Sequence, residues 1–167
     1  TFDLSPELAI TEVPDYASGK EEFVRTEIPA DLVEATRKRV EAAGLTPTEE
    51  EFNGLLSYVW PAMVKMKARD EKYRKIRADY FTMDQGREYL RELSIDELPG
   101  LTTPETTAVM LALSFAMDMP IHFVAPAFGF QKNIPYPDNQ KLREMIKPIW
   151  NICEKFCLLY TSDAADD

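Results

Sequence analysis

One segment of this chain, residues 92–97, carries the side chains best suited to chemistry. Polar Glu92, Ser94 and Asp96 alternate with a leucine and an isoleucine, which is the period of a β-strand with one polar face. Ionised carboxylates are costly to bury unless they are paired or bind a metal ion. A strand that keeps carboxylates on one face therefore points to general acid–base chemistry or to a divalent metal site. The same pattern also fits the solvent face of an edge strand.

Other residues extend this candidate site. We expect Asp3 to act with Glu92 and Asp96 as an acid–base carboxylate, and Glu92 to be a metal ligand. Substrate contacts are expected from polar or charged side chains near the strand ends, namely Ser94, Glu97, Thr103 and Lys132. Lys132 is a compact positive charge in a loop rich in Gly and Pro, which suits it to hold a carboxylate or phosphate of the substrate. A lone loop lysine that is only solvated is the alternative.

Two conspicuous features are interpreted as structural. His122 is the single histidine and lies within an apolar run, so we expect a packed residue and not a ligand. The run 72–75, Lys-Tyr-Arg-Lys, is expected to form the charged outer face of a helix.

The spacing of hydrophobic residues and the positions of proline, glycine and capping residues predict the strands and helices that hold these side chains. We expect strands at 1–3, 88–96 and 121–125, and a loop from residue 4 to about 28 with Pro and Gly as punctuation. Four helices are expected, at 31–43, from Thr48 towards Arg77, from Thr103 to before Pro120, and at 139–156. Thr48 with Glu51 has the spacing of a capping box, and Pro104 suits the first turn of the third of these helices.

Strands that alternate with helices are typical of a parallel α/β protein. A complete (β/α)8 TIM-type barrel takes about 250 residues, so three strands with their helices would form part of one. Catalysis in such barrels takes place at the carboxyl ends of the strands. Those ends are here Asp3, Asp96 with Glu97, and the segment from Pro126 onward.

Composition excludes several classes of protein. The formal net charge of −10 argues against nucleic acid as a partner. No apolar run approaches the roughly 18 residues of a spanning helix, so we expect no membrane segment and a cytoplasmic location. The two cysteines, Cys153 and Cys157, predict neither a disulfide framework nor a zinc site. Glycine-rich phosphate loops and serine-hydrolase elbows are missing from the sequence.

The two ends suggest a piece of a longer gene. Thr1 is not a start methionine, and ordinary codons for residues 157–167 spell a string that looks like translated sequencing adapter. We therefore expect residues 1–156 to form one partial barrel domain and residues 157–167 to be a tail that is not natural protein.

Three motifs in order resemble the tagaturonate epimerase family. They are the Glu-x-Ser-x-Asp-Glu strand at 92–97, the Thr-Thr-Pro-Glu helix start at 102–105, and the Ala-Pro-Ala-Phe strand end at 125–128 that leads to Lys132. The opening Thr-Phe-Asp-Leu-Ser at 1–5 is similar to an earlier strand of that family.

The resemblance implies a metal-dependent barrel enzyme that interconverts the keto-hexuronates tagaturonate and fructuronate in bacterial sugar-acid catabolism. The chain departs from the family pattern at Thr107, where a His is expected, and at Ala127, where an Arg is expected. A related keto-sugar or sugar acid is therefore the alternative substrate. A metal-dependent sugar aldolase and a non-catalytic carbohydrate-binding domain are the alternative functions.

Overall fold

The computed structural model describes residues 1–98, 100–131, 133–156 and 159–160. Lys132 and most of the tail, residues 157–158 and 161–167, lie outside the described residues. The strands are short and run in the order β1 (Phe2–Asp3), β2 (Glu92–Ser94), β3 (Phe123–Ala125) and β4 (Leu159–Tyr160). The helices are α1 (Ser5–Ala9), α2 (Ala17–Glu27), α3 (Ala30–Ala42), α4 (Glu49–Tyr80), α5 (Asp84–Arg87), α6 (Pro104–Ala116) and α7 (Asn139–Lys155).

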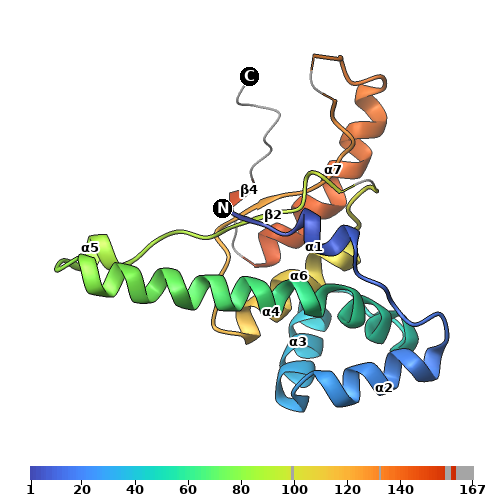
Figure 1. Ribbon diagram of the computed structural model, residues 1–167. Helices are drawn as coiled ribbons and strands as arrows, with labels where there is room; N and C mark the ends of the chain where they lie inside the picture. Colours follow the sequence, from blue (N-terminus) through green and yellow to red (C-terminus); the bar gives the residue numbers. More distant parts are fainter. Residues whose placement is uncertain (99, 132, 157–158, 161–167) are drawn as a thin grey trace.

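The four strands form one parallel sheet in which the spatial order is the chain order, β1-β2-β3-β4. Phe2 pairs with Leu93, and Leu93 pairs with Val124, so these three residues form one row across the sheet. Helices connect the successive strands, and α4, α6 and α7 pack side by side (Figure 1). The chain is therefore an α/β protein with a small parallel sheet, as the sequence predicts.

One face of the sheet belongs to the hydrophobic core. Phe2, Leu93 and Val124 are buried in a single cluster with side chains of the helices. Leu93 and Ile95 are fully buried, whereas Glu92 and Asp96 are partly exposed. The alternation predicted within the strand is thus confirmed for residues 92–96, because apolar residues face the helices and polar residues face away. The strand itself spans Glu92–Ser94 and not the expected 88–96.

Helix α4 is the longest element and begins as its sequence predicts. The Thr48 hydroxyl accepts a hydrogen bond from the Glu51 N–H at 3.3 Å, and the Glu51 carboxylate accepts from the Thr48 N–H at 2.8 Å. Pro61 lies inside the helix without ending it. The last buried residue of α4 is Asp70, and the remaining turns project past the sheet as an arm that ends in α5 (Figure 1).

The stretch expected to be a loop from residue 4 to 28 instead contains helices α1 and α2. Pro6 lies in the first turn of α1, where its missing N–H costs nothing. Val24 of α2 is buried in the core that α2 shares with α4. The proline and glycine residues mark the ends of short helices here, and the prediction of a continuous loop was wrong.

Helix α3 begins slightly earlier than expected, with Pro29 and not Asp31 at its N-cap. Asp31 lies in the first turn, where a carboxylate is favoured by the helix dipole. The helix ends at Ala42, and Gly44 follows the C-cap with a φ of 90°. The Gly44 N–H donates to the Glu41 carbonyl, and the Leu45 N–H donates to the Val40 carbonyl. This is a Schellman ending, for which glycine is the preferred residue.

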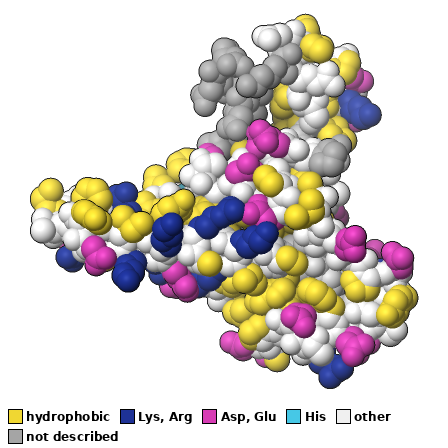
Figure 2. All heavy atoms as spheres, in the orientation of Figure 1, with side chains coloured by type: hydrophobic (Ala, Val, Ile, Leu, Met, Phe, Trp, Pro, Cys, Tyr) yellow, Lys and Arg dark blue, Asp and Glu magenta, His cyan; other side chains and the backbone are white. Residues whose placement is uncertain are grey.

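Large apolar side chains remain exposed on the arm. They include Tyr73, Ile76, Tyr80, Phe81 and Leu90, and Figure 2 shows hydrophobic atoms gathered along this projection. No helix in the described parts of the chain combines the length and the apolar character needed to cross a membrane.

Candidate functional site

The polar row of the sheet runs across β1 and β2 on the face opposite the core. Asp3 pairs with Ser94, and Ser94 pairs with Ala125, so these three residues point to the same side of the sheet. Glu92 stands two residues before Ser94 on that same side. The structure therefore brings Asp3, Glu92 and Ser94 to one face, as the sequence predicts.

Hydrogen bonds tie this row together in two places. The Thr1 hydroxyl donates to Oε1 of Glu92 at 2.8 Å and so joins the two strands at their amino ends. The Ser94 hydroxyl donates to Oδ1 of Asp96 at 2.5 Å. Because Ser94 is only 5% exposed, its hydroxyl holds the Asp96 carboxylate in a fixed position just past the end of β2.

The carboxyl end of β1 is joined to that of β2 through Ser5. The Ser5 N–H donates to Oδ1 of Asp3 at 2.9 Å, and the buried Ser5 hydroxyl accepts from the Glu97 N–H at 3.3 Å. The Glu97 side chain itself is exposed. Arg69 of α4 donates to the Asp3 carbonyl at 3.2 Å from the side of β1 that faces away from β2.

Thr103 serves as the N-cap of α6. Its hydroxyl accepts from the Thr106 N–H at 3.1 Å and lies 3.1 Å from the Thr106 hydroxyl. The neighbouring Thr102 hydroxyl accepts from the Ala127 N–H at 2.8 Å, which fastens the start of α6 to the end of β3. The predicted substrate contact of Lys132 lies outside the described residues.

The carboxylate oxygens of Asp3, Glu92 and Asp96 suit a hard divalent ion, but the described residues do not form a complete set of ligands. Within residues 1–98, 100–131, 133–156 and 159–160, no three His, Cys, Asp or Glu side chains come close enough together to hold a metal ion. Asp3, Glu92 and Asp96 also lie outside the lining of the groove of about 650 Å³ beside Arg91 and of the groove of about 320 Å³ beside Phe2. Glu92 can supply one ligand to a metal ion, and a complete set would need donors from elsewhere.

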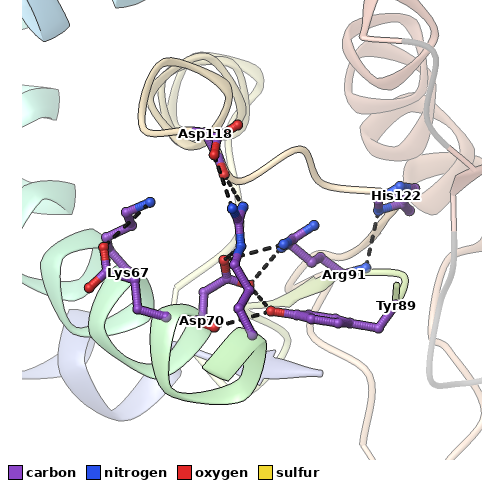
Figure 3. Close-up of polar contacts among 8 residues, drawn as sticks. Lys67, Asp70, Tyr89, Arg91, Asp118 and His122 are labelled. Carbon is purple, nitrogen blue, oxygen red and sulfur yellow. Dashed lines mark hydrogen bonds and ion pairs between the residues drawn. The ribbon is translucent and has the colours of Figure 1, made fainter. Parts of the chain in front are cut away.

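A second polar cluster, centred on Asp70, lies at the amino ends of the strands (Figure 3). The Asp70 side chain is fully buried at the point where α4 leaves the sheet. It accepts hydrogen bonds from Arg91 Nε at 2.7 Å, Arg91 Nη2 at 3.3 Å, Arg74 Nε at 2.7 Å and the Tyr89 hydroxyl at 2.5 Å. These four bonds use the accepting capacity of both carboxylate oxygens.

The electrostatics of this Asp70 cluster follow from burial and charge pairing. Burial raises the pKa of Asp70, but hydrogen bonds from Arg91 and Tyr89 and the charges of Arg91 and Arg74 outweigh it and hold that pKa below its usual value. Burial and the bond to Asp70 raise the pKa of Tyr89. Arg74 also pairs with Asp118 at 3.0 Å, at the carboxyl end of α6. The cluster thus ties α4, β2 and the end of α6 together.

The sequence carries signals for this cluster that the alternation rules could have revealed. Asp70 continues the buried stripe of α4 from Met63 and Met66 at helical spacing. Arg91 stands two residues before Leu93 and four before Ile95 in an alternating strand pattern, so it points to the same buried side. The run 72–75 lies on the charged, largely exposed face of α4, as expected, but Arg74 of this run also bonds to the buried Asp70. An inward-facing acid and an inward-facing base imply that the two are partners.

His122 is half-buried, directly precedes β3 and bonds to the backbone of Arg91. Its ring Nδ1 accepts a hydrogen bond from the Arg91 backbone N–H at 3.1 Å, and the His122 backbone N–H donates to the Arg91 carbonyl at 2.8 Å.

The chain was also compared with protein-family models, with curated proteins and with solved structures, and no significant match was found. The basis for a functional assignment is therefore the geometry together with the motifs of the sequence.

Proposed function

We propose that this chain is part of a (β/α)8 TIM-type barrel of a metal-dependent carbohydrate epimerase. The observation that carries the proposal is the row of Asp3, Glu92 and Ser94 on the sheet face opposite the helices, with Asp96 at the end of β2. In a barrel this face is the interior, and the carboxyl ends of its strands form the active site.

The topology supports the barrel interpretation. Each strand lies next to its predecessor in the chain, and a helix intervenes between consecutive strands. A doubly wound sheet would instead reverse its strand order at a switch point. Closure by further strands would complete the interior face and add donors beside Glu92.

The proposed substrates are the keto-hexuronates tagaturonate and fructuronate, or a related keto-sugar. The carbon to be inverted is not adjacent to the ketone carbon but is separated from it by one further carbon. Enolisation alone therefore cannot invert it. We propose that a carboxylate takes the proton of the hydroxyl on that carbon, the adjacent carbon–carbon bond breaks, and its electron pair forms an enolate. Rotation of the aldehyde fragment, re-addition of the enolate and return of the proton give the epimer without net oxidation.

Specific residues of this chain have assigned roles in this proposal. Asp96, fixed by Ser94, acts as the acid–base group, and Asp3 is the second carboxylate of the pair. Glu92 contributes a ligand to a divalent ion, which when bound would stabilise the oxyanion of the substrate. Ser94, Glu97, Thr103 and Lys132 are proposed to contact the sugar acid, a small molecule handled in the cytoplasm.

The test uses a protein that contains the complete barrel, saturated with divalent metal. Replacing Asp96 by Asn, or Glu92 by Gln, is expected to keep the fold and to lower turnover of keto-hexuronates about a hundredfold or more. The matched control is Glu21→Gln on α2, an exposed carboxylate whose loss should leave activity unchanged. Equal turnover in all three variants would reject the assigned roles.

The products distinguish the alternatives. An epimerase yields a six-carbon isomer with almost no cleavage, whereas an aldolase accumulates three-carbon fragments, and a binding domain yields neither. A well-folded protein with no turnover of any keto-hexuronate or ketohexose contradicts the epimerase proposal.

A further inference from the structure

A groove of about 650 Å³ opens at the amino-terminal edge of the sheet, beside the Asp70 cluster. This is the edge opposite the carboxyl ends at which Asp96 and Ser5 lie, because Arg91 directly precedes β2 and His122 directly precedes β3. The polar side chains that line the groove are mostly cationic or hydrogen-bond donors, namely Arg74, Arg87, Arg91, His122, Gln85 and Tyr89.

Arg91 provides a fixed donor to this groove. Its side chain is only 9% exposed, and its Nε and Nη2 are both bonded to Asp70. The remaining nitrogen, Nη1, has no hydrogen-bond acceptor among the described residues, and Figure 3 shows the outer end of the guanidinium pointing away from Asp70. Because Asp70 also accepts from Arg74 and Tyr89, it has no capacity left to draw Nη1 inward.

His122 provides a second donor. Its Nδ1 accepts a hydrogen bond from the Arg91 N–H, so in the neutral ring the proton resides on Nε2. The Nε2–H of a groove-lining residue is then the donor left for a ligand. The Arg91 backbone carbonyl accepts from the His122 backbone N–H, and the Arg91 backbone N–H donates to Nδ1 of the ring, so the imidazole is fixed beside residue 91.

Arg87, the last residue of α5, also lines the groove and provides a third donor. Its Nε donates to the Phe81 carbonyl at 2.9 Å, and it forms no ion pair with an acid in the part of the chain that the structure describes. Glu88 is the single acidic residue among those that line the groove. Positive charge is also concentrated locally, since residues 65–91 hold nine Lys or Arg against five Asp or Glu in a chain with a net charge of −10.

We propose that this groove binds a small oxyanion of the phosphate type, held by Arg87, Arg91 and His122. Guanidinium groups match the oxygens of phosphate closely, and the rigid anchoring of Arg91 on Asp70 lowers the entropy lost on binding. Because the three donors come from separate elements, each can bond to a different oxygen of a tetrahedral phosphate group. The ligand is inorganic phosphate or a phosphate monoester, and the site is independent of the function proposed for the carboxylate row.

Titration calorimetry on the 167-residue chain tests the proposal, with sodium phosphate and glycerol 3-phosphate as probes at constant ionic strength. One saturable site is expected. Arg87→Gln and His122→Asn are each expected to weaken binding about tenfold, the scale of a lost hydrogen bond to a charged group. Asn at position 122 keeps an acceptor for the Arg91 N–H while it removes the Nε2 donor. Arg25→Gln on exposed α2 is the charge-matched control and should bind as the parent does.

Several outcomes would overturn the proposal. They are the absence of a saturable signal with both probes, equal weakening by Arg25→Gln and Arg87→Gln, and acetate binding as tightly as phosphate. Binding of a single-stranded RNA oligonucleotide that phosphate fails to displace would overturn it in favour of a nucleic-acid surface. Tighter binding of glycerol 3-phosphate than of phosphate supports the proposal and identifies the monoester as the ligand. Arg87 is exposed, so its variant is expected to fold and the test does not depend on substitutions at Arg91.

Discussion

At the scale of single residues, Asp70 and Arg91 show how a buried charge is tolerated. Asp70 is completely buried, yet it is matched by two guanidinium groups and a phenol hydroxyl that together complete its hydrogen bonds. Removing one partner leaves the other charge buried and unpaired, which costs more than the pair contributes. The Asp70 cluster is therefore expected to be the polar feature of the chain most sensitive to mutation.

Replacing Arg91 by Met is expected to lower the free energy of unfolding by about 3 kcal/mol, because it leaves the Asp70 carboxylate without its closest buried cation. Urea denaturation at neutral pH measures the change. The matched control is Arg25→Met on exposed α2, for which we expect a change within about 0.5 kcal/mol. Equal effects of the two substitutions would show that the Asp70 cluster does not contribute to stability.

The lowered pKa of Asp70 predicts a specific pH dependence. A carboxyl group whose pKa is lower in the folded state stabilises the protein above its unfolded pKa of about 4, and this contribution is lost as pH falls through the folded pKa. The difference in unfolding free energy between the parent and Asp70→Asn should therefore be largest near neutral pH and shrink below about pH 4. Growth of that difference in acid would show that Asp70 is protonated in the folded protein.

At the scale of elements, α4 connects both ends of the sheet. It begins at its capping box beside α2, where Glu50 pairs with Lys20, then crosses the core and passes Asp70 before it projects as the arm. Its exposed turns carry apolar side chains, including Tyr73 and Ile76, beside a groove of about 320 Å³ that reaches Phe2 of β1. The helix therefore depends on the part from Glu49 to Asp70, which holds all of its buried residues, for most of its tertiary packing.

Replacing Thr48 by Ala is expected to destabilise the protein by about 1 kcal/mol, since the substitution removes both side-chain bonds of the capping box that involve the hydroxyl. Thermal or urea unfolding followed by circular dichroism measures the effect. Thr46→Ala, two residues upstream and exposed outside any helix, is the control and should be neutral. A neutral Thr48→Ala would mean that packing alone determines where α4 begins.

At the scale of the whole molecule, the chain separates two kinds of polar surface at opposite edges of one sheet. Carboxylates and hydroxyls gather towards the carboxyl ends of the strands, as with Asp3, Ser94 and Asp96. Arginine residues gather at the amino ends, around Asp70. Parallel strands make this separation possible, because all of their carboxyl ends meet at one edge and all of their amino ends at the other.

Removal of residues 157–167 is expected to change the free energy of unfolding by no more than about 0.5 kcal/mol. The described part of this segment, β4, contributes a two-residue pairing to the edge of the sheet. A chain that ends after Pro148 is the contrasting truncation, because it also loses buried Ile149, Ile152 and Cys153 and should unfold. A loss well above 0.5 kcal/mol from the first truncation would show that the tail packs as native structure.

The sequence by itself determined the features that depend on neighbouring residues. The capping pair of Thr48 and Glu51, the cap at Thr103 and the alternation around Ser94 all follow from contacts within a few residues, and the structure confirms them. The short helices α1 and α2 were missed, because short helices are stabilised mainly by packing and their proline boundaries resemble those of a loop.

Only the tertiary structure decided which residues meet across the chain. Asp70 finds Tyr89 and Arg91 about twenty positions away, and Arg74 reaches Asp118 from the end of another helix. Local patterns show that Asp70 and Arg91 point inward, but the identity of a partner depends on how helices pack on the sheet. That packing is a collective result of burying the whole apolar surface, so no single stretch of the sequence encodes it.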